Sequence, residues 1–372
     1  MSVRLQRLVD RLATADWAGA ALMPATNLTY LTGLQFHPGK RLTLFLIPAT
    51  GATPVMVLPQ LELERVRAAA PFSIHYVAWS DAAGPLTALA AGMEAAFGTS
   101  TPMKPLAVEH TVMRLMELRA LETVAPGLRT VDVDPLLSEL RLVKEADELA
   151  LMEQAVTIVE QALHATLAQV RPGLSERALS RILSEAILAA GGERESFTNI
   201  VASGPNAANP HHENSDRLLQ PGDLVVIDCG AVYRNYHSDI TRTIAIGEPD
   251  PEARRIYEIV LAANTAGRAA ARPGATGSAI DAAARSVIEA AGYGAAFVHR
   301  TGHGLGLETH ELPNIVAGND APLMPGTVFT VEPGIYLPGR LGVRIEDDVL
   351  ITADGSRSLT SFPRELIVVK EG

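Results

Sequence analysis

Several features are scarce in this sequence, and each scarcity excludes a class of protein. A single cysteine, Cys229, rules out a disulfide within the chain, so we expect a reducing, cytoplasmic setting. No run of about eighteen apolar residues occurs, and residues 1–16 carry charges at helical spacing, so neither a membrane span nor a secretory signal is predicted. Basic residues number 31 against 42 acidic ones, and the net charge of −11 argues against nucleic acid or a membrane surface as a partner.

The composition is otherwise that of an ordinary globular protein. Hydrophobic residues make up 47% and charged residues 20% of the 372 residues, a length that favours two domains. In residues 1–140, short apolar runs that are typical of strands alternate with amphipathic segments that are typical of helices. The strand candidates are 19–24, 41–48, 53–59, 73–79 and 105–110, and the helix candidates are 60–70, 85–97 and 111–124. We therefore predict an α/β layer domain, without a phosphate-binding loop or dinucleotide fingerprint.

Residues 141–372 contain an internal repeat. An amphipathic helical segment, 144–170, is followed by Arg-Pro-Gly, a serine and a second helical segment that ends at glycine. The same order returns in residues 251–292, with threonine in place of serine. Strand-like segments follow each copy, so the pattern predicts a duplicated α-α-β unit whose halves meet around a pseudo-two-fold axis. The alternative is a chance echo between two alanine-rich helix pairs.

Two aspartates lie in the strand segments that follow the first copy. Asp228 ends the apolar run LVVID, and Asp239 comes after a stretch that can turn and run back. Such a hairpin would bring both carboxylates together, and Thr241 would share a strand face with Asp239 as a donor to a ligating carboxylate. The alternative is a pair of ordinary strand-end aspartates. Cys229 adjoins Asp228 in the same apolar run, so we expect it to be a small buried filler, with a thiolate ligand as the alternative.

Three more ligand candidates follow the second copy. His303 lies between glycines in TGHGLG, Glu332 follows the apolar run VFTV, and Glu346 is in VRIEDDVLI. Arg344 would share a strand face with Glu346 and orient it. The alternatives are a satisfied polar histidine and a surface ion pair. The four carboxylates and one imidazole suit hard or borderline divalent cations bound in pairs, which predicts a two-metal hydrolase.

Six segments occur in the order SGPNAANPHH, DCG, SDITRT, GHGLGLETHE, VEPGIY and RIEDD, and they resemble those of the pita-bread metallopeptidases. The resemblance covers nearly the whole chain. It is closest to the proline-specific branch, which comprises Xaa-Pro dipeptidases (prolidases) and aminopeptidase P. It implies a creatinase-like α/β N-terminal domain over residues 1–140 and an α+β pita-bread catalytic domain, with the internal pseudo-two-fold repeat, over residues 141–372.

The resemblance also implies roles for single residues. Two divalent metal ions would be bound by Asp228, Asp239, His303, Glu332 and Glu346, with Asp239 and Glu346 bridging them. Manganese is the first choice, and cobalt or zinc would accept the same ligands. Glu332 would also shuttle a proton from the metal-activated water to the leaving nitrogen.

Further side chains would contact the substrate. His211 falls at a substrate-contacting histidine of the family, and the adjacent His212 is the alternative. His310 would polarise the scissile carbonyl, and His299 would lie at the pocket edge. Tyr336 and Arg344 are further substrate-binding candidates.

We therefore predict a cytoplasmic, homodimeric enzyme that hydrolyses the Xaa-Pro bond of dipeptides, small peptides with proline in second position. That bond is a tertiary amide without N–H, so metals and a proline-shaped pocket must replace recognition of that group. Arg41, in QFHPGKRLTLF, resembles a prolidase arginine before a hydrophobic strand, and it would bind the free carboxylate of a dipeptide. The alternative is that Lys40 and Arg41 face solvent at the start of a strand.

Four other functions compete with this one. Aminopeptidase P has the same chemistry but acts on longer peptides. Methionine aminopeptidase usually lacks the N-terminal domain, and creatinase resembles the fold without the metal ligands. A non-catalytic peptide-binding paralogue would have lost ligands, whereas all five are present here.

Overall fold

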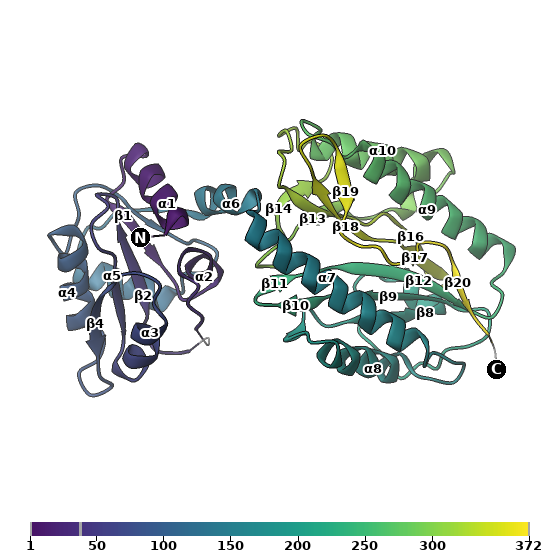
Figure 1. Cartoon of the computed structure of the whole chain (residues 1–372), viewed down its shortest axis with the longest axis horizontal. Coiled ribbons are helices and arrows are strands. Elements are labelled where there is room, and N and C mark those ends of the chain that lie inside the picture. The colour runs from purple at the N-terminus through teal and green to yellow at the C-terminus, as the bar shows by residue number, and fades with distance from the viewer. Residues whose placement is uncertain (1, 37–38, 371–372) are drawn as a thin grey trace. The chain divides into compact units, whose positions relative to one another are not determined.

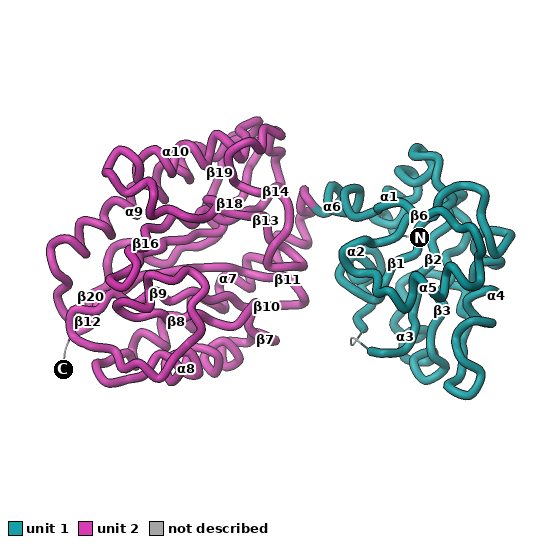
Figure 2. Tube along the Cα trace, turned by 180° about the vertical axis from the view of Figure 1, so that it is seen from behind, with its two compact units in different colours: residues 1–141 teal, residues 142–372 magenta. Residues whose placement is uncertain are grey.

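The computed structural model describes residues 2–36 and 39–370. The chain divides into two compact units, residues 1–141 and 142–372 (Figure 2). Each unit has a hydrophobic core of its own. No helix among the described residues combines the length and the apolar content that a bilayer crossing needs.

A six-stranded mixed sheet forms the centre of the N-terminal unit (Figure 1). Its order is β4-β3-β2-β1-β5-β6, and β2 runs antiparallel to β1 and β3 while the other neighbours are parallel. The strands are β1 (Gly19–Leu22), β2 (Leu44–Pro48), β3 (Val55–Pro59), β4 (His75–Trp79), β5 (Leu106–Val108) and β6 (Thr130–Asp132). The α-helices are α1 (Val3–Thr14), α2 (Thr26–Thr32), α3 (Leu63–Ala69), α4 (Leu86–Phe97), α5 (Leu115–Val124) and α6 (Asp134–Leu142). The predicted α/β layers are therefore present.

The C-terminal unit contains two helix pairs, which cover opposite sides of its strands (Figure 1). The first pair is α7 (Ala146–Leu167) and α8 (Glu176–Ala189), and the second is α9 (Pro251–Ala270) and α10 (Gly277–Ala290). These are the helices that the two copies of the sequence repeat predict.

The turns between the paired helices match in detail. The Ser175 hydroxyl caps α8 by accepting a backbone N–H at 3.2 Å, and the Thr276 hydroxyl caps α10 in the same way at 3.0 Å. Gly173 and Gly274 precede these caps with φ of 82° and 78°, a region that favours glycine. Each donates its N–H to a carbonyl of the segment that follows its helix pair, at 2.9 and 2.8 Å. The duplication thus includes the hydrogen bonds as well as the pattern of residues.

The described strands of this unit form four sheets, with orders β11-β10-β7, β20-β12-β9-β8, β14-β13-β15-β18-β19 and β16-β17. From the first half come β7 (Arg194–Glu195), β8 (Ile200–Ser203), β9 (Leu224–Cys229), β10 (Ala231–Tyr233), β11 (Tyr236–His237) and β12 (Ile240–Ile246). From the second come β13 (Gly302–Gly304), β14 (Glu311–Ile315), β15 (Val328–Val331), β16 (Gly334–Leu337), β17 (Leu341–Arg344), β18 (Asp347–Ile351), β19 (Ser356–Ser358) and β20 (Ile367–Val369).

Candidate metal centre

Strand pairing in the first half brings two aspartates to the same end of a sheet. β9 and β12 are antiparallel, with Thr241 opposite Asp228. Asp239 immediately precedes β12, so its carboxylate lies at the end of the pair where Asp228 lies. This is the hairpin arrangement that the spacing of the two residues predicts.

The second half places two glutamates in the same manner. β15 and β18 are antiparallel, with Val331 opposite Asp347. Glu332 follows the first strand and Glu346 precedes the second, so both leave the pair at one end. His303 lies in β13, which pairs with β15 in the same sheet. The N–H of Glu346 donates to the Thr241 carbonyl at 3.1 Å and joins the two halves at this point.

These side chains meet around one cavity of about 800 Å³. Ligand atoms of Asp239, His303 and Glu346 lie within 4.8 Å of one another. Asp228 and Glu332 line the same cavity. The structure thus brings together every residue that the sequence analysis proposes as a metal ligand.

The carboxylates of the proposed ligands accept few hydrogen bonds from the protein. Arg344 Nη2 donates to Asp228 Oδ2 at 2.7 Å, and the Thr241 hydroxyl donates to Glu346 Oε2 at 2.6 Å. Within residues 2–36 and 39–370, buried Asp228 Oδ1 and Asp239 Oδ1 have no hydrogen-bond partner. Buried carboxylate oxygens without donors are costly, and divalent cations would satisfy them. The donor set therefore fits divalent metal ions.

The pKa values of the carboxylates at this site are also those expected of a site for cations. Burial, together with the charge of Glu346, raises the pKa of Asp239 well above its ordinary value. Burial, together with the charge of Glu332, does the same to the pKa of Glu346. Burial also raises the pKa of Glu332 to about 7. Carboxylates packed this closely repel one another, and bound cations would remove the repulsion.

His303 is oriented as a ligand would be. Its Nδ1 lies 3.0 Å from the Gly304 carbonyl oxygen, which leaves Nε2 facing Glu332 Oε1 at 3.4 Å and Asp239 Oδ2 at 3.8 Å. Burial lowers the pKa of His303 to about 3, so its imidazole is neutral near neutral pH. A neutral imidazole with one nitrogen fixed by a carbonyl is the form that binds metals.

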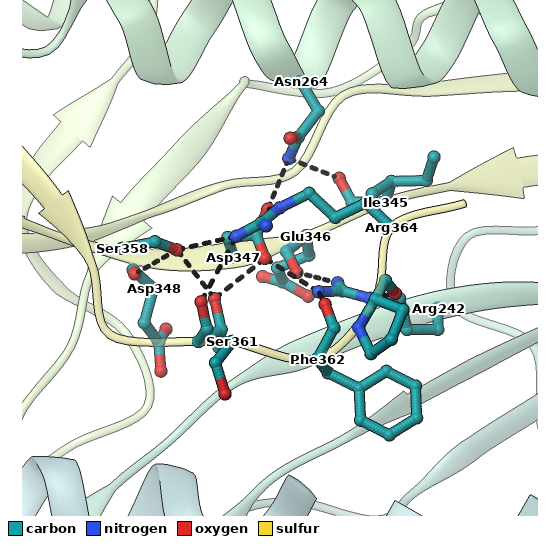
Figure 3. Close-up of polar contacts among 12 residues, drawn as sticks. Arg242, Asn264, Ile345, Glu346, Asp347, Asp348, Ser358, Ser361, Phe362 and Arg364 are labelled. Carbon is teal, nitrogen blue, oxygen red and sulfur yellow. Dashed lines mark hydrogen bonds and ion pairs between the residues drawn. The ribbon is translucent and has the colours of Figure 1, made fainter.

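A polar network behind Glu346 fixes the backbone from several elements (Figure 3). Asp347 accepts from Arg242 Nη2 at 2.8 Å, from Arg364 Nε at 2.7 Å and from Asn264 Nδ2 at 3.1 Å. Arg242 Nη1 also donates to the carbonyl of Glu346. Because these partners come from β12, α9 and the segment before β20, the position of Glu346 depends on contacts distributed over the whole unit.

The remaining histidines lie in or beside the same cavity. His211, His299 and His310 line it, and the ring centroids of His303 and His310 are 4.2 Å apart. Burial and the nearby charge of Arg300 lower the pKa of His310. The adjacent His212 turns away, with Nε2 2.7 Å from Glu176 Oε2. Of the two neighbours in sequence, His211 is therefore the one that faces the cavity.

Comparison with known proteins identifies the family. The model described as "Metallopeptidase family M24" matches residues 150–353, and that described as "Creatinase/Prolidase N-terminal domain" matches residues 4–143. The chain belongs to metallopeptidase family M24. The predicted family and fold class are thereby confirmed.

Relatives of this M24 chain include named peptidases. A probable dipeptidase PepE of Mycobacterium bovis is 42% identical over 98% of this chain and 96% of its own length. The solved structure of a recombinant prolidase from Thermococcus sibiricus has a TM-score of 0.92 at 36% identity, covering 99% of this chain and 100% of the other. That of an X-Pro aminopeptidase from Thermotoga maritima MSB8 has a TM-score of 0.85 at 33% identity, covering 98% and 99%.

Two substrate-binding candidates of this M24 chain are engaged with other protein groups. Arg344 donates to Asp228, to the Thr241 hydroxyl at 3.1 Å and to the Tyr336 hydroxyl at 2.9 Å. The Tyr336 hydroxyl also lies 2.8 Å from Nε2 of His299. Arg344 lines the cavity, but its hydrogen bonds go to Asp228, Thr241 and Tyr336.

Arg41 lies in the N-terminal unit, at the surface. Its Nε and Nη2 donate to the two oxygens of Asp81 at 2.8 and 2.7 Å. Both side chains are exposed, and the pair raises the pKa of Arg41 through the Asp81 hydrogen bond. A role in binding the substrate carboxylate remains a prediction.

Sequence reasoning missed two residues that bear on this site. Arg300 lines the cavity, and its only signal was its place three residues before His303 in RTGHG. Glu176 is fully buried beneath the loop that carries His211, and the sequence marks it only as the first residue of a helix. Cys229 is fully buried within the core, and burial raises the pKa of its thiol well above the ordinary value, as expected for a filler.

Proposed function

We propose that this M24 metallopeptidase is an Xaa-Pro dipeptidase that works with two divalent metal ions. The observation that carries the proposal is the convergence of four carboxylates and one imidazole on a single cavity, with two buried carboxylate oxygens unsatisfied among the described residues. Relatives named dipeptidase and prolidase across nearly the full chain support the substrate class.

The ligands would be shared between two sites. Asp228, Asp239, His303, Glu332 and Glu346 would hold the ions between them. Manganese is the first choice, and cobalt or zinc would accept the same donors. When bound, the ions polarise the scissile carbonyl and lower the pKa of a water molecule.

Protein side chains would supply the remaining steps. His310 would donate a hydrogen bond to the scissile carbonyl oxygen as it gains negative charge. Glu332 would pass a proton to the proline nitrogen, which must be protonated before it can leave. His211 and His299, on the wall of the cavity, would contact the bound peptide.

The surroundings of Arg300 support a dipeptide, rather than a longer peptide, as the substrate. Its Nη1 donates to the neutral Asn314 Oδ1 at 2.6 Å, and in the described part of the chain no carboxylate forms an ion pair with it. Arg344, the other guanidinium that lines the cavity, already pairs with Asp228. A dipeptide places its free carboxylate beside the proline ring, where a guanidinium can bind both oxygens. We therefore assign this carboxylate to Arg300, and Arg41 is the alternative from the sequence.

Aminopeptidase P activity is the second candidate function. The likeness to the Thermotoga maritima X-Pro aminopeptidase favours it, because the fold and its metal ligands suit both activities. The two activities differ in whether residues may follow the proline, so the carboxylate contact decides between them.

Three peptides test the proposal after manganese loading: Ala-Pro, Ala-prolinamide and Ala-Pro-Ala. An Xaa-Pro dipeptidase cleaves Ala-Pro best, and Arg300→Met should raise KM for Ala-Pro about tenfold or more with a smaller effect on Ala-prolinamide, which lacks the carboxylate. Arg41→Met under the same conditions tests the alternative. Arg272→Met, an exposed arginine of the same unit, is the matched control.

Each outcome has a distinct meaning. Efficient cleavage of Ala-Pro-Ala by the wild type would favour aminopeptidase P. Equal losses on Ala-Pro and Ala-prolinamide in Arg300→Met would reject the carboxylate contact while the peptidase assignment stands. The cytoplasmic location and the homodimer stay predictions, and light scattering on the purified protein tests the second.

A further inference from the structure

Glu176 is a buried acid that lies outside the metal centre. It is the first residue of α8, directly after the capping Ser175, and its side chain is fully buried. An ionised carboxylate in such a place needs several donors. Among the described residues, the hydrogen-bond partners of the Glu176 carboxylate come from one segment, residues 203–215.

The two oxygens of Glu176 bind opposite ends of that segment. Oε1 accepts from the Ser203 N–H at 2.8 Å, from the Ser203 hydroxyl at 2.6 Å and from Asn206 Nδ2 at 3.0 Å. Oε2 accepts from the Ser215 N–H at 3.1 Å and from its hydroxyl at 2.6 Å, and lies 2.7 Å from His212 Nε2. One carboxylate thus joins the start of the segment to its end.

The segment between these contacts forms part of the cavity wall. Apart from a short 3-10 turn, η2 (Gly204–Ala208), it has no helix or strand of its own after β8. It carries Pro210 and His211, which line the cavity, and His211 is exposed. Because His212 is held by Glu176, the residue before it is directed toward the cavity. The Glu176–His212 contact ties the neighbour of His211 to helix α8, while within the segment the His211 N–H donates to Asn209 Oδ1 at 3.1 Å.

The second half of the repeat holds its own wall in a related way. Asp281 of α10 is buried, accepts from the Thr301 hydroxyl at 2.7 Å and pairs with Arg285. Arg285 in turn donates to the carbonyl of His299 at 2.9 Å. In each half, an acid on the second helix of the pair fixes a loop that carries a cavity histidine.

We propose that Glu176 is a positioning residue, which holds His211 at the substrate through its contacts with His212 and the two flanking serines. This inference rests on the proposed peptidase function for its kinetic consequence but not for its structural one. Glutamine has nearly the same shape as glutamate, but its NH₂ group would face N–H and O–H donors at one end of the segment. Glu176→Gln should therefore release the loop while leaving the metal ligands in place.

Two measurements on the full-length, manganese-loaded protein test the inference. Hydrogen exchange followed by mass spectrometry should rise in residues 209–213 of Glu176→Gln, with little change around residues 228–239. The value of kcat/KM for Ala-Pro should fall about ten- to hundredfold at unchanged metal content. Glu117→Gln, which removes a buried carboxylate paired with Arg114 in the N-terminal unit, is the matched control and should change neither.

A double-mutant cycle separates positioning from a general loss of structure. If Glu176 acts through His211, Glu176→Gln costs little further activity once His211→Ala is present. The inference would be overturned if Glu176→Gln lowered kcat/KM by the same factor with His211 present and with His211→Ala. Unchanged hydrogen exchange in residues 209–213 would overturn it as well. Should Glu176→Gln not fold, His212→Gln keeps a donor toward Glu176 and should retain activity that His212→Ala loses. Increased exchange without any peptide cleavage, even by the wild type, would leave the positioning role intact and reject the proposed function instead.

Discussion

Arg344 Nη2 lies 2.7 Å from Asp228 Oδ2, and this ion pair joins the two halves of the catalytic unit. Arg344 comes from β17 and Asp228 from β9. Both side chains are largely buried, and the guanidinium also donates to Thr241 and Tyr336. The arginine therefore fixes one oxygen of Asp228 while the other oxygen stays free for a cation.

Replacing this arginine should weaken metal binding without abolishing it. We predict that Arg344→Met lowers manganese affinity and kcat/KM about ten- to hundredfold, as is common when the partner of a ligand is lost. Arg344→Lys keeps the positive charge but cannot make all three hydrogen bonds of the guanidinium. Its manganese affinity and kcat/KM should therefore lie between those of the wild type and of Arg344→Met. Competition with a chelator measures the affinity, and an unchanged dissociation constant in Arg344→Met would show that the pair does not orient Asp228.

The network around Asp347 should contribute strongly to the stability of the C-terminal unit. Asp347→Asn would leave the buried Arg242 and the half-buried Arg364 without their carboxylate, and we predict a loss of about 3–5 kcal/mol in the free energy of unfolding. Asp81→Asn, which breaks the exposed pair with Arg41, should change the free energy of unfolding far less, because solvent screens that pair. Urea unfolding measures both, and equal losses would contradict the distinction.

His310 should act on turnover rather than on metal content. Removing one donor to a developing oxyanion costs about 10²–10³ in kcat in comparable enzymes, so we predict a loss of that size for His310→Ala. Metal analysis of the same preparation should give the wild-type stoichiometry. Loss of metal instead would make His310 a ligand and would change the proposed ligand set.

The stability that Glu176 contributes should depend on pH. Burial raises its pKa, but hydrogen bonds from Ser203, Ser215 and His212 outweigh burial and bring the pKa from 4.5 to about 2. Since the folded pKa is the lower one, this contribution is fully present above about pH 4.5 and is lost as the pH falls toward 2. The difference in unfolding free energy between wild type and Glu176→Gln should therefore shrink below pH 4.5. A difference that grows on acidification would contradict the assignment.

Local signals in the sequence were sufficient for much of the fold. The helix pairs followed from amphipathic spacing, and their boundaries followed from Arg-Pro-Gly and the capping Ser175 and Thr276. Thr241 was expected to support a ligand because alternation along a strand is local, and it does donate to Glu346. The two domains were also expected from length and from the change in pattern.

Contacts between distant segments could not be read in the same way. Residues 343–351 were expected as one strand with Arg344 beside Glu346, but the strand is interrupted after Arg344 and resumes at Asp347. Arg344 instead pairs with Asp228, and it is linked to Glu346 through the Thr241 hydroxyl. The exposed partner of Arg41 and the partners of the buried Glu176 could not be predicted either, because each pairing depends on how the chain folds back.

A metal titration tests whether the enzyme works with two metal ions. Metal-free protein is titrated with Mn²⁺ while the release of proline from Ala-Pro is followed. We expect no turnover without metal and a plateau at about two equivalents per chain, as two shared sites require. Full turnover at one equivalent would contradict the dinuclear assignment, and no turnover with manganese, cobalt or zinc at any ratio would contradict the Xaa-Pro dipeptidase function itself.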